Sequence, residues 1–435
     1  MKRIYKISAV VVIMMAIAIQ FTRAGAPGMP WEDFQNPQEP NTVKGILVDA
    51  ETGNPLIFAT VALQNSNVAT VTNLDGEFLL KIAKGAVDPI IEISYIGYKN
   101  KVIPIGDLKL DGRDNRIELS QAIIPIREVV IRPISPIDIM ETVIRSIPKN
   151  YTEAPNLMTS FYRETIKRNR NYVSIAEAVV EILKAPYSSE FRFDMSRIYK
   201  GRKNVEISRL DTVLFKLQGG PVSTLQLDLI KNPYSILTYD ALESYNYILE
   251  NIIVIDDRNH YVIEFHQKPD VETPLFLGKL FVDMETFALT EAEFSINLDD
   301  EEKASEIFIR KKPLGMKVTP EMASYRVKYR EQGGKWYFAY SRAEVRFKCD
   351  WKKKLFNDNY TTMSEIAVTD RTEEQVIKFS SQERIRRGDV FIETLSAFAD
   401  PDFWGDYNVI EPDQSIESAI RRLSRKLRFS DREGE

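Results

Sequence analysis

The sequence of 435 residues contains only one cysteine, Cys349, and two histidines, His260 and His266. A single cysteine excludes an intramolecular disulfide, even in an oxidising compartment. A zinc carboxypeptidase needs a histidine and a glutamate three residues apart and a second, distant histidine, and neither histidine here has a glutamate at that spacing. The scarcity of both residues excludes disulfide scaffolds and argues against a histidine-bound zinc enzyme.

Long apolar runs and an excess of positive charge are absent as well. The apolar run at residues 7–19 falls short of the ~20 residues that a membrane-spanning helix needs. Because basic residues precede this run and small residues follow it, we predict a signal peptide over residues 1–24. Its removal takes away four basic residues and no acidic residue, which changes the net charge from −5 to −9 and argues against nucleic acid as a partner.

Motifs of the common enzyme classes are missing too. The sequence has no Gly-x-Ser-x-Gly, no His-Glu-x-x-His and no phosphate-binding glycine loop. Ser146 and Lys149 match the Ser-x-x-Lys pattern of acyl-serine enzymes, but Pro148 should interrupt the helical turn that the pattern requires, and its companion motifs are lacking. We therefore predict a protein that is not an enzyme, with no catalytic residue and no cofactor.

Two groups of side chains resemble metal ligands only superficially. His260, Glu264 and His266 share one face of a predicted strand, but the two histidines would lie about 20 Å apart, and only Glu264 and His266 could be neighbours. Residues 297–302 offer oxygen ligands for calcium without the glycine and spaced glutamate of an EF-hand, so a turn before a helix is the favoured interpretation. We predict no metal site, and burial of Cys349 as a small apolar residue.

What the sequence does contain, from Val43 onward, is a series of short strands. Alternating apolar positions are separated by turn residues such as Asp75-Gly76, which precedes Phe78, Leu80 and Ile82. Glycine supplies the positive φ of a tight hairpin and aspartate can bond the turn backbone, so this corner needs no catalytic explanation. About seven strands in roughly 80 residues predict a small β-sandwich.

The motifs of this segment resemble the carboxypeptidase-regulatory-like domain. The stretches that carry the resemblance are Gly45-x-Leu47-x-Asp49, Thr52-Gly53-x-Pro55-Leu56, Ala59-x-Val61, Thr72-Asn73-Leu74-Asp75-Gly76-x-Phe78 and Ile93-Ser94-Tyr95-Ile96-Gly97-Tyr98. The resemblance covers residues 42–122 and implies a transthyretin-like sandwich of a Gram-negative envelope protein, without peptidase activity. Residues 64–67, Gln-Asn-Ser-Asn, depart from it because they replace the usual Gly-Thr turn.

The rest of the chain predicts a second, larger β domain. Ser135 should cap a helix that begins at Pro136, and long strands follow to about residue 400. Residues 343–352 alternate strictly between apolar and charged side chains, which predicts an antiparallel sheet whose apolar face must be covered by helices, curvature or a ligand. Residues 278–296 are similar to the hairpins of periplasmic lipoprotein-carrier half-barrels, which wrap a curved sheet around a helical plug.

A basic amphipathic helix is predicted near the C-terminus. Ile416, Ile420, Leu423 and Leu427 form one stripe, with arginines and a lysine beside it. Such a helix can make peripheral contact with an anionic membrane. Acidic residues at its start provide ordinary capping, so docking on the protein's own sheet is the favoured interpretation.

Together these patterns predict a mainly β protein: an N-terminal transthyretin-like β-sandwich plus a larger antiparallel β domain with a few helices. The predicted parts are a signal peptide (1–24), a linker (25–41), the sandwich (42–122), a second linker (123–135), the antiparallel domain (136–400) and a C-terminal helix and tail (401–435). We expect an exported protein, periplasmic or associated with the outer membrane, that binds an outer-membrane protein or a glycan. The alternative is a periplasmic carrier of an acyl chain or other apolar ligand.

Overall fold

The computed structural model describes residues 40–110, 114–122, 134–188, 193–205, 219–232, 236–309, 315–352, 357–374, 376–397 and 403–421. The predicted signal peptide, most of both predicted linkers and the tail after residue 421 lie outside these ranges, so the structure does not test them. In the ranges that are described, no helix combines the length and apolar character needed to cross a membrane. Residues Asn41–Glu435 belong to one compact unit.

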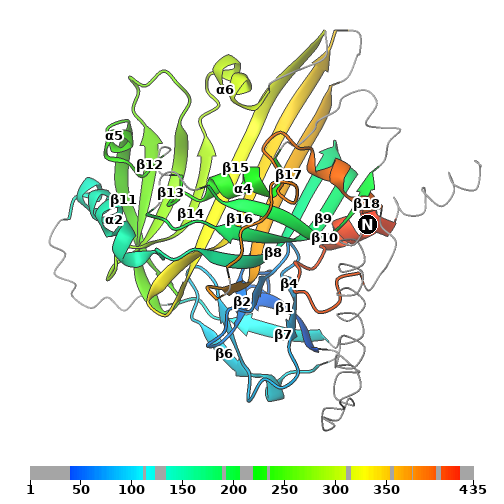
Figure 1. The fold of residues 1–435 in the computed structure, drawn as a ribbon. Helices are drawn as coiled ribbons and strands as arrows, with labels where there is room; N and C mark the ends of the chain where they lie inside the picture. The colour runs from blue at the N-terminus through cyan, green and yellow to red at the C-terminus, as the bar shows by residue number, and fades with distance from the viewer. Residues whose placement is uncertain are drawn as a thin grey trace, which may run out of the picture. The chain divides into compact units, whose positions relative to one another are not determined.

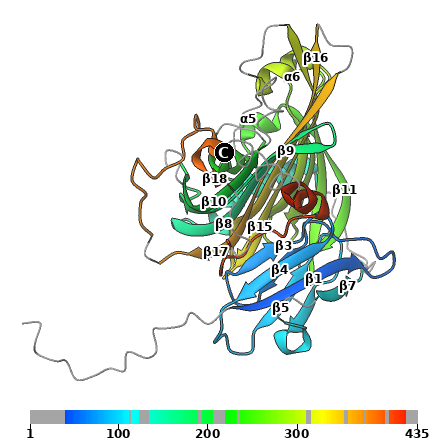
Figure 2. The same ribbon diagram turned by 90° about the vertical axis from the view of Figure 1, so that its right-hand side faces the viewer.

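The first seven strands form the predicted sandwich of two sheets (Figures 1 and 2). One sheet has the order β4-β1-β7, in which β1 pairs antiparallel with β4 and parallel with β7. The other has the order β3-β2-β5-β6 and is antiparallel throughout. The bounds are β1 Asn41–Asp49, β2 Thr60–Leu63, β3 Ala69–Val71, β4 Glu77–Ile82, β5 Ile90–Ser94, β6 Lys101–Pro104, the short helix η2 Ile105–Asp107 and β7 Asp114–Leu119.

The Asp75-Gly76 corner is a tight turn, but it joins β3 of one sheet to β4 of the other, so the predicted hairpin between paired strands is wrong. The side-chain oxygen of Asn73 accepts the backbone N–H of Asp75 at 2.9 Å, and Gly76 has a φ of 75°. A Cβ atom at Gly76 would lie 2.7 Å from the carbonyl oxygen of Leu47, so only glycine fits. The Asp75 carboxylate has a further role that the sequence did not reveal, because it accepts the N–H of Gln414 at 2.7 Å and so joins the sandwich to the C-terminal helix.

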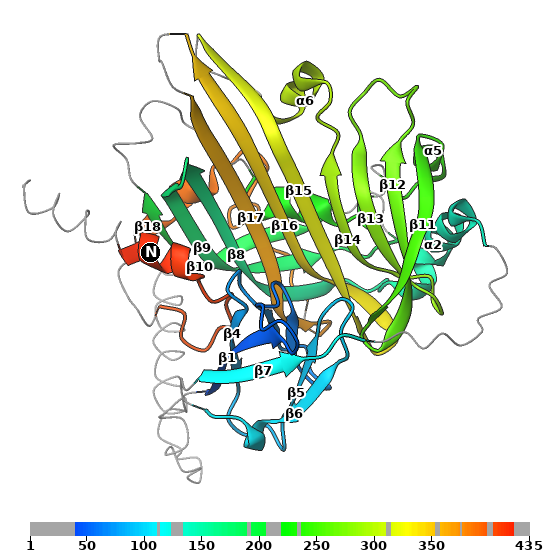
Figure 3. The ribbon, with the colours of Figure 1, turned by 180° about the vertical axis from the view of Figure 1, so that it is seen from behind.

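The larger domain is one sheet of eleven strands in the order β11-β12-β13-β14-β15-β16-β17-β8-β9-β10-β18 (Figure 3). Its neighbours are antiparallel except β10 and β18, which run parallel. The confirmed fold class is thus mainly β with few helices. The bounds are β8 Asn156–Arg168, β9 Asn171–Lys184, β10 Met195–Val205, β11 Tyr245–Ile255, β12 Arg258–Gln267, β13 Phe276–Asp283, β14 Leu289–Ile296, β15 Met316–Gln332, β16 Lys335–Trp351, β17 Asp358–Thr372 and β18 Ser396–Ala397.

Helices from the same chain cover one face of this sheet, which we call the inner face. The main core cluster joins residues of α2 and of the segment 221–242 to inward side chains of the sheet, among them Ile263, Leu280 and Phe338. Farther along the long strands, Phe308 of α6 packs edge-on against Phe347. The covering helices are α2 Pro136–Asn150, α4 Pro221–Thr224, η3 Leu225–Leu227, α5 Tyr239–Leu242 and α6 Glu301–Phe308, and a further short helix, η5, spans Phe391–Thr394.

Strand β16 shows the predicted alternation. Val345, Phe347 and Cys349 are buried on the inner face, whereas Arg346 is exposed on the opposite face. The apolar face is therefore covered by the protein's own helices, which is one of the three possibilities that the sequence left open.

Helix α2 begins where it was predicted, but its interior differs from the expectation. Pro148 lies inside the helix, which continues to Asn150, so the predicted interruption of the turn between Ser146 and Lys149 is wrong. A proline this close to the end removes one backbone donor, and the N–H of Tyr151 still bonds the carbonyl of Ile147 at 3.0 Å. Ser135 occupies the N-cap position without a side-chain hydrogen bond.

The outer face of the large sheet carries the sandwich and the C-terminal segment. Residues 414–421 are helical, and Ile416 and Ala419 pack against Tyr172 and Ile175 of β9. The Asp413 carboxylate caps this helix by accepting the N–H of Ile416 at 2.8 Å. The helix thus docks on the protein's own sheet over the residues described, while Leu423 and Leu427 of the predicted stripe lie beyond them.

Candidate functional site

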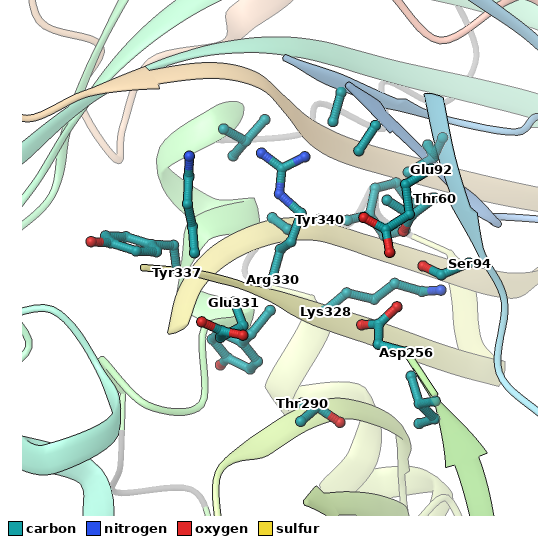
Figure 4. A pocket seen from close by; sticks show the side chains of 18 of the residues that line it. Thr60, Glu92, Ser94, Asp256, Thr290, Lys328, Arg330, Glu331, Tyr337 and Tyr340 are labelled. Atoms are coloured by element: carbon teal, nitrogen blue, oxygen red, sulfur yellow. The ribbon is translucent and has the colours of Figure 1, made fainter. Parts of the chain in front are cut away.

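A polar cavity of about 520 Å³ lies between the sandwich and the outer face of the large sheet (Figure 4). One wall is the outward surface of the β3-β2-β5-β6 sheet. Strand alternation builds this wall, because Ile91 and Ile93 of β5 point into the sandwich core while Glu92 and Ser94 between and after them line the cavity together with Thr60 of β2.

The opposite wall consists of β15 and β16 near the hairpin that joins them. Lys328 and Arg330 line the cavity, whereas Val327 and Tyr329 belong to the core on the inner face. Figure 4 shows both cationic side chains rising from the same strand across from the sandwich residues. Tyr337 and other residues of β16 complete this wall.

Most cations around the cavity have carboxylate partners. The Lys328 ammonium lies 3.3 Å from Glu291 and donates to the carbonyl oxygen of Phe58 at 2.9 Å. Burial lowers the pKa of Lys328, although Glu291 opposes this effect. Arg371 lies 3.2 Å from Glu373. These ion pairs lie within the large sheet and neutralise the two cations, whereas the hydrogen bond from Lys328 to Phe58 joins the sheet to the sandwich.

Arg330 is the exception. Its Nη2 donates to the carbonyl oxygen of Asn67 at 2.7 Å, but its buried Nη1 has no hydrogen-bond partner and no carboxylate of the described residues forms an ion pair with it. Burial and the positive charge of Arg371 lower the pKa of Arg330 to about 10, with Asp256 partly offsetting them. The side chain remains charged at neutral pH and is an unsatisfied donor on the cavity wall.

Strand register explains why Arg330 lacks a partner. The β14–β15 ladder places Glu293 opposite Arg326 and Glu291 opposite Lys328, and it ends there. On the other side of β15, Arg330 lies opposite Tyr337 of β16. Arg330 is therefore one alternate position beyond the last acidic partner, on the same face of the strand.

The loop that departs from the family pattern reaches this site. Asn67 accepts from Arg330 through its backbone carbonyl, and its side-chain oxygen accepts from Nη2 of Arg371 at 3.1 Å. Its side-chain amide donates to the carbonyl oxygen of Arg371. Asn65 and Ser66 also line the cavity. The substituted turn is thus part of the cavity wall.

Two acidic side chains line the cavity near the sandwich. Glu92 accepts from the amide of Asn100 at 3.2 Å, and Asp256 lies in the turn between β11 and β12. Neither histidine nor Cys349 is among the residues that line this cavity. Its chemistry is that of a polar binding site with cationic and anionic walls.

The sequence-derived metal candidates do not come together. His260 is buried, with Nδ1 2.9 Å from the carbonyl oxygen of Arg258, and burial lowers its pKa. His266, at the other end of the histidine pair, is exposed, and Glu264 is partly buried. Over the part of the chain that the structure describes, no group of three histidine, cysteine or acidic side chains is placed to hold a metal ion.

The remaining candidates have structural positions. Asp300 caps α6 by accepting the N–H of Lys303 at 3.0 Å, and this hydrogen bond lowers the pKa of Asp300. Asn297 caps the preceding turn through the N–H of Asp299 at 2.8 Å. Burial raises the pKa of the Cys349 thiol to about 12, so the thiol is unreactive at neutral pH.

Residues 43–131 match the sequence profile of the family described as CarboxypepD_reg-like domain. The chain therefore carries a CarboxypepD_reg-like domain. The match begins one residue after the predicted start of the sandwich and extends past its predicted end, over residues that lie partly outside those described. It covers the front of the chain and leaves the eleven-stranded sheet unassigned.

A curated relative shares the same region. The TonB-dependent receptor SusC of Bacteroides thetaiotaomicron is 41% identical over 64 residues, which is 15% of this chain and 6% of the receptor. The chain thus spans a small part of the length of that relative.

Solved structures resemble the chain only distantly. A DUF1329 family protein from Desulfovibrio piger aligns with 11% identity and a TM-score of 0.24, covering 56% of this chain and 96% of that one. A putative outer membrane lipoprotein-sorting protein domain from Vibrio parahaemolyticus aligns with 10% identity and a TM-score of 0.25, covering 55% and 93%. The second matches the sequence resemblance to lipoprotein carriers, but at TM-scores this low neither structure informs function.

Proposed function

We propose that this protein is a non-catalytic binding protein of the bacterial cell envelope. It holds a polar partner, an outer-membrane protein or a glycan, at the cavity between its CarboxypepD_reg-like domain and its large sheet. The observation that supports this function is Arg330, a charged side chain on the cavity wall with an unsatisfied buried donor. An envelope location draws on the predicted signal peptide and on the relation of the sandwich to part of a TonB-dependent receptor.

We propose the same domain limits as the sequence predicts. Strand β7 ends at Leu119 and α2 begins at Pro136, which supports a sandwich at 42–122 and a second domain from 136. The second domain contributes one wall of the cavity and the sandwich the other. Binding would therefore require both domains.

A cavity-filling substitution tests this function. Ser94→Trp places a large side chain on the cavity wall, whereas Glu118→Trp places the same side chain on the exposed surface of β7. Full-length variants are immobilised and incubated with envelope extract, and retained proteins and glycans are identified by mass spectrometry. We expect wild type and Glu118→Trp to retain the same partner and Ser94→Trp to lose it. Equal retention by Ser94→Trp would refute the function, provided that circular dichroism shows all three folded.

The carrier alternative has less support. An acyl chain would need the inner face, where Met140 of α2 and Leu229 and Ile236 of the segment after η3 already pack against the sheet. Loading would require these segments to leave the core. Extraction of lipid from the purified protein separates the two hypotheses, and we expect no stoichiometric acyl lipid.

A further inference from the structure

We propose, resting on the function proposed above, that the cavity binds a small anionic polyol: its carboxylate pairs with Arg330 and its hydroxyl groups donate to Glu92 and Asp256. Both walls contribute, since Arg330 belongs to β15 and Glu92 to β5 of the sandwich. A sugar acid of the uronate type has this combination of groups.

The carboxylate of the proposed ligand is inferred from the unsatisfied hydrogen-bond donors of Arg330. A guanidinium offers five N–H donors in a fixed fork that matches a carboxylate. Among the residues that the structure describes, only Asn67 accepts one of these donors, from Nη2 at 2.7 Å, and the buried Nη1 is unsatisfied. Lys328, by contrast, is neutralised by Glu291 at 3.3 Å. A bound anion would satisfy the one cation of the described cavity wall that has no acidic partner.

The hydroxyl groups of the proposed ligand are inferred from the two acidic side chains that line the same cavity. Ionised carboxylates only accept hydrogen bonds, so Glu92 and Asp256 call for donors. A simple inorganic anion such as chloride or sulfate has no hydrogen-bond donor for these two acids. A ligand with several hydroxyl groups satisfies both acids while its carboxylate stays at Arg330.

The size of the cavity and its aromatic lining suit such a ligand. The volume of about 520 Å³ lies in the usual range of small-molecule sites. Tyr95 and Tyr337 line it from the two walls. Asn65 and Ser66, from the loop that departs from the family pattern, add further polar groups.

The matched probes are glucuronate, glucose and acetate, measured by isothermal titration calorimetry with the full-length protein at low ionic strength. Glucuronate has both the anion and the hydroxyl groups, glucose only the hydroxyl groups, and acetate only the anion. We expect glucuronate to bind. Glucose and acetate should each bind at least about tenfold more weakly than glucuronate, because each lacks one set of contacts. Added salt should weaken the binding of glucuronate and leave the binding of glucose unchanged, because glucose carries no charge.

Arg330→Gln identifies the side chain responsible. This variant should reduce glucuronate affinity about tenfold or more, to the level of glucose. Lys317→Gln is the control, because it removes the same charge from an exposed position of the same strand and should bind glucuronate as wild type does. Thermal unfolding of each variant confirms that it is folded.

Three outcomes would overturn the assignment. These are equal affinity for glucuronate and glucose, unchanged glucuronate affinity in Arg330→Gln, and no glucuronate binding at millimolar concentration. If Ser94→Trp nevertheless abolishes retention of an envelope partner, the ligand class is wrong and the proposed function stands. If Ser94→Trp retains that partner, the proposed function itself fails.

Discussion

Two cations of the large sheet, Lys184 on the inner face and Arg330 on the outer face, differ in how their charge is balanced. On the inner face, the ammonium of Lys184 lies 2.5 Å from Asp194 and 2.7 Å from Asp228. Asp228 also accepts the hydroxyl of Tyr329 at 2.8 Å. On the outer face, Arg330 has no acidic partner among the described residues and borders a cavity.

This difference separates charge that stabilises the fold from charge available to a ligand. Burial alone would lower the pKa of Lys184, but Asp194 and Asp228 raise it above its ordinary value. For Arg330 burial prevails and the pKa falls. Because Asp228 also accepts the backbone N–H of Ile230 at 3.1 Å, the inner cluster fixes the covering segment to the sheet. Among the described residues, Nη1 of Arg330 makes no hydrogen bond that fixes one segment to another.

Removal of the inner cation should have the largest effect. Lys184→Met leaves Asp194 and Asp228 buried without a cation, and we expect a loss of roughly 3–5 kcal/mol of stability. Urea denaturation followed by tryptophan fluorescence measures it. Lys317→Met, at an exposed position, is the control and should change stability by less than about 0.5 kcal/mol. An unchanged denaturation midpoint for Lys184→Met would remove the contrast between Lys184 and Arg330.

A second inner-face group should make stability depend on pH. Burial raises the pKa of Glu164 from 4.5 to about 8, even though the hydroxyl of Tyr162 donates to it. The raised pKa means that the folded state favours the protonated form of Glu164. The contribution of Glu164 to the free energy of unfolding is therefore fully present below pH 4.5 and is lost as the pH rises to about 8. Glu164→Gln should therefore be more stable than wild type at pH 8, by a few kcal/mol at most.

Denaturation midpoints from pH 4.5 to 9 test this prediction. The advantage of Glu164→Gln should grow across that interval and then remain constant. Glu321→Gln, at an exposed position of β15, should show no such trend. Parallel curves for wild type and Glu164→Gln would contradict the prediction.

The link between the sandwich and the C-terminal helix should have a smaller effect. Asp75→Ala removes the acceptor of the Gln414 N–H, and we expect about 1 kcal/mol of local destabilisation. Hydrogen exchange should increase for residues 414–421 and stay unchanged in β15. Glu118→Ala, at an exposed position of β7 in the same domain, is the control.

Removal of the outer cation should have the smallest effect on stability. Arg330→Met eliminates a partly buried charge that no acid neutralises, so we expect stability to be unchanged or raised by at most about 1 kcal/mol. The same denaturation experiment measures it. A loss as large as that of Lys184→Met would show that Arg330 is a structural ion.

Local patterns of the sequence predict most of the architecture. The alternation of Val345, Phe347 and Cys349 predicts the face of β16, and Asp75-Gly76 predicts a tight turn, because both depend on residues close in the chain. The predicted hairpin pairing is wrong, because tertiary packing places β3 and β4 in different sheets. The prediction that Pro148 interrupts the helix is wrong, because the last turn of α2 tolerates the loss of one backbone N–H donor. The signal peptide and the stripe at Leu423 and Leu427 remain predictions.

The candidate site could not be predicted in the same way. Arg326, Lys328 and Arg330 alternate along β15, and this basic face was visible in the sequence. Which of the three lacks a partner depends on the register with Glu291 and Glu293, a contact between separate strands. The approach of the sandwich, which closes the cavity, is likewise set by tertiary packing.

The most direct test is a crystal structure of the full-length protein soaked with glucuronate. The account predicts the sugar in the cavity, with its carboxylate oxygens within about 3 Å of the Arg330 guanidinium and hydroxyl groups facing Glu92 and Asp256. The proposed site would be contradicted if calorimetry detects glucuronate binding to the same protein but the crystal structure shows no sugar in the cavity.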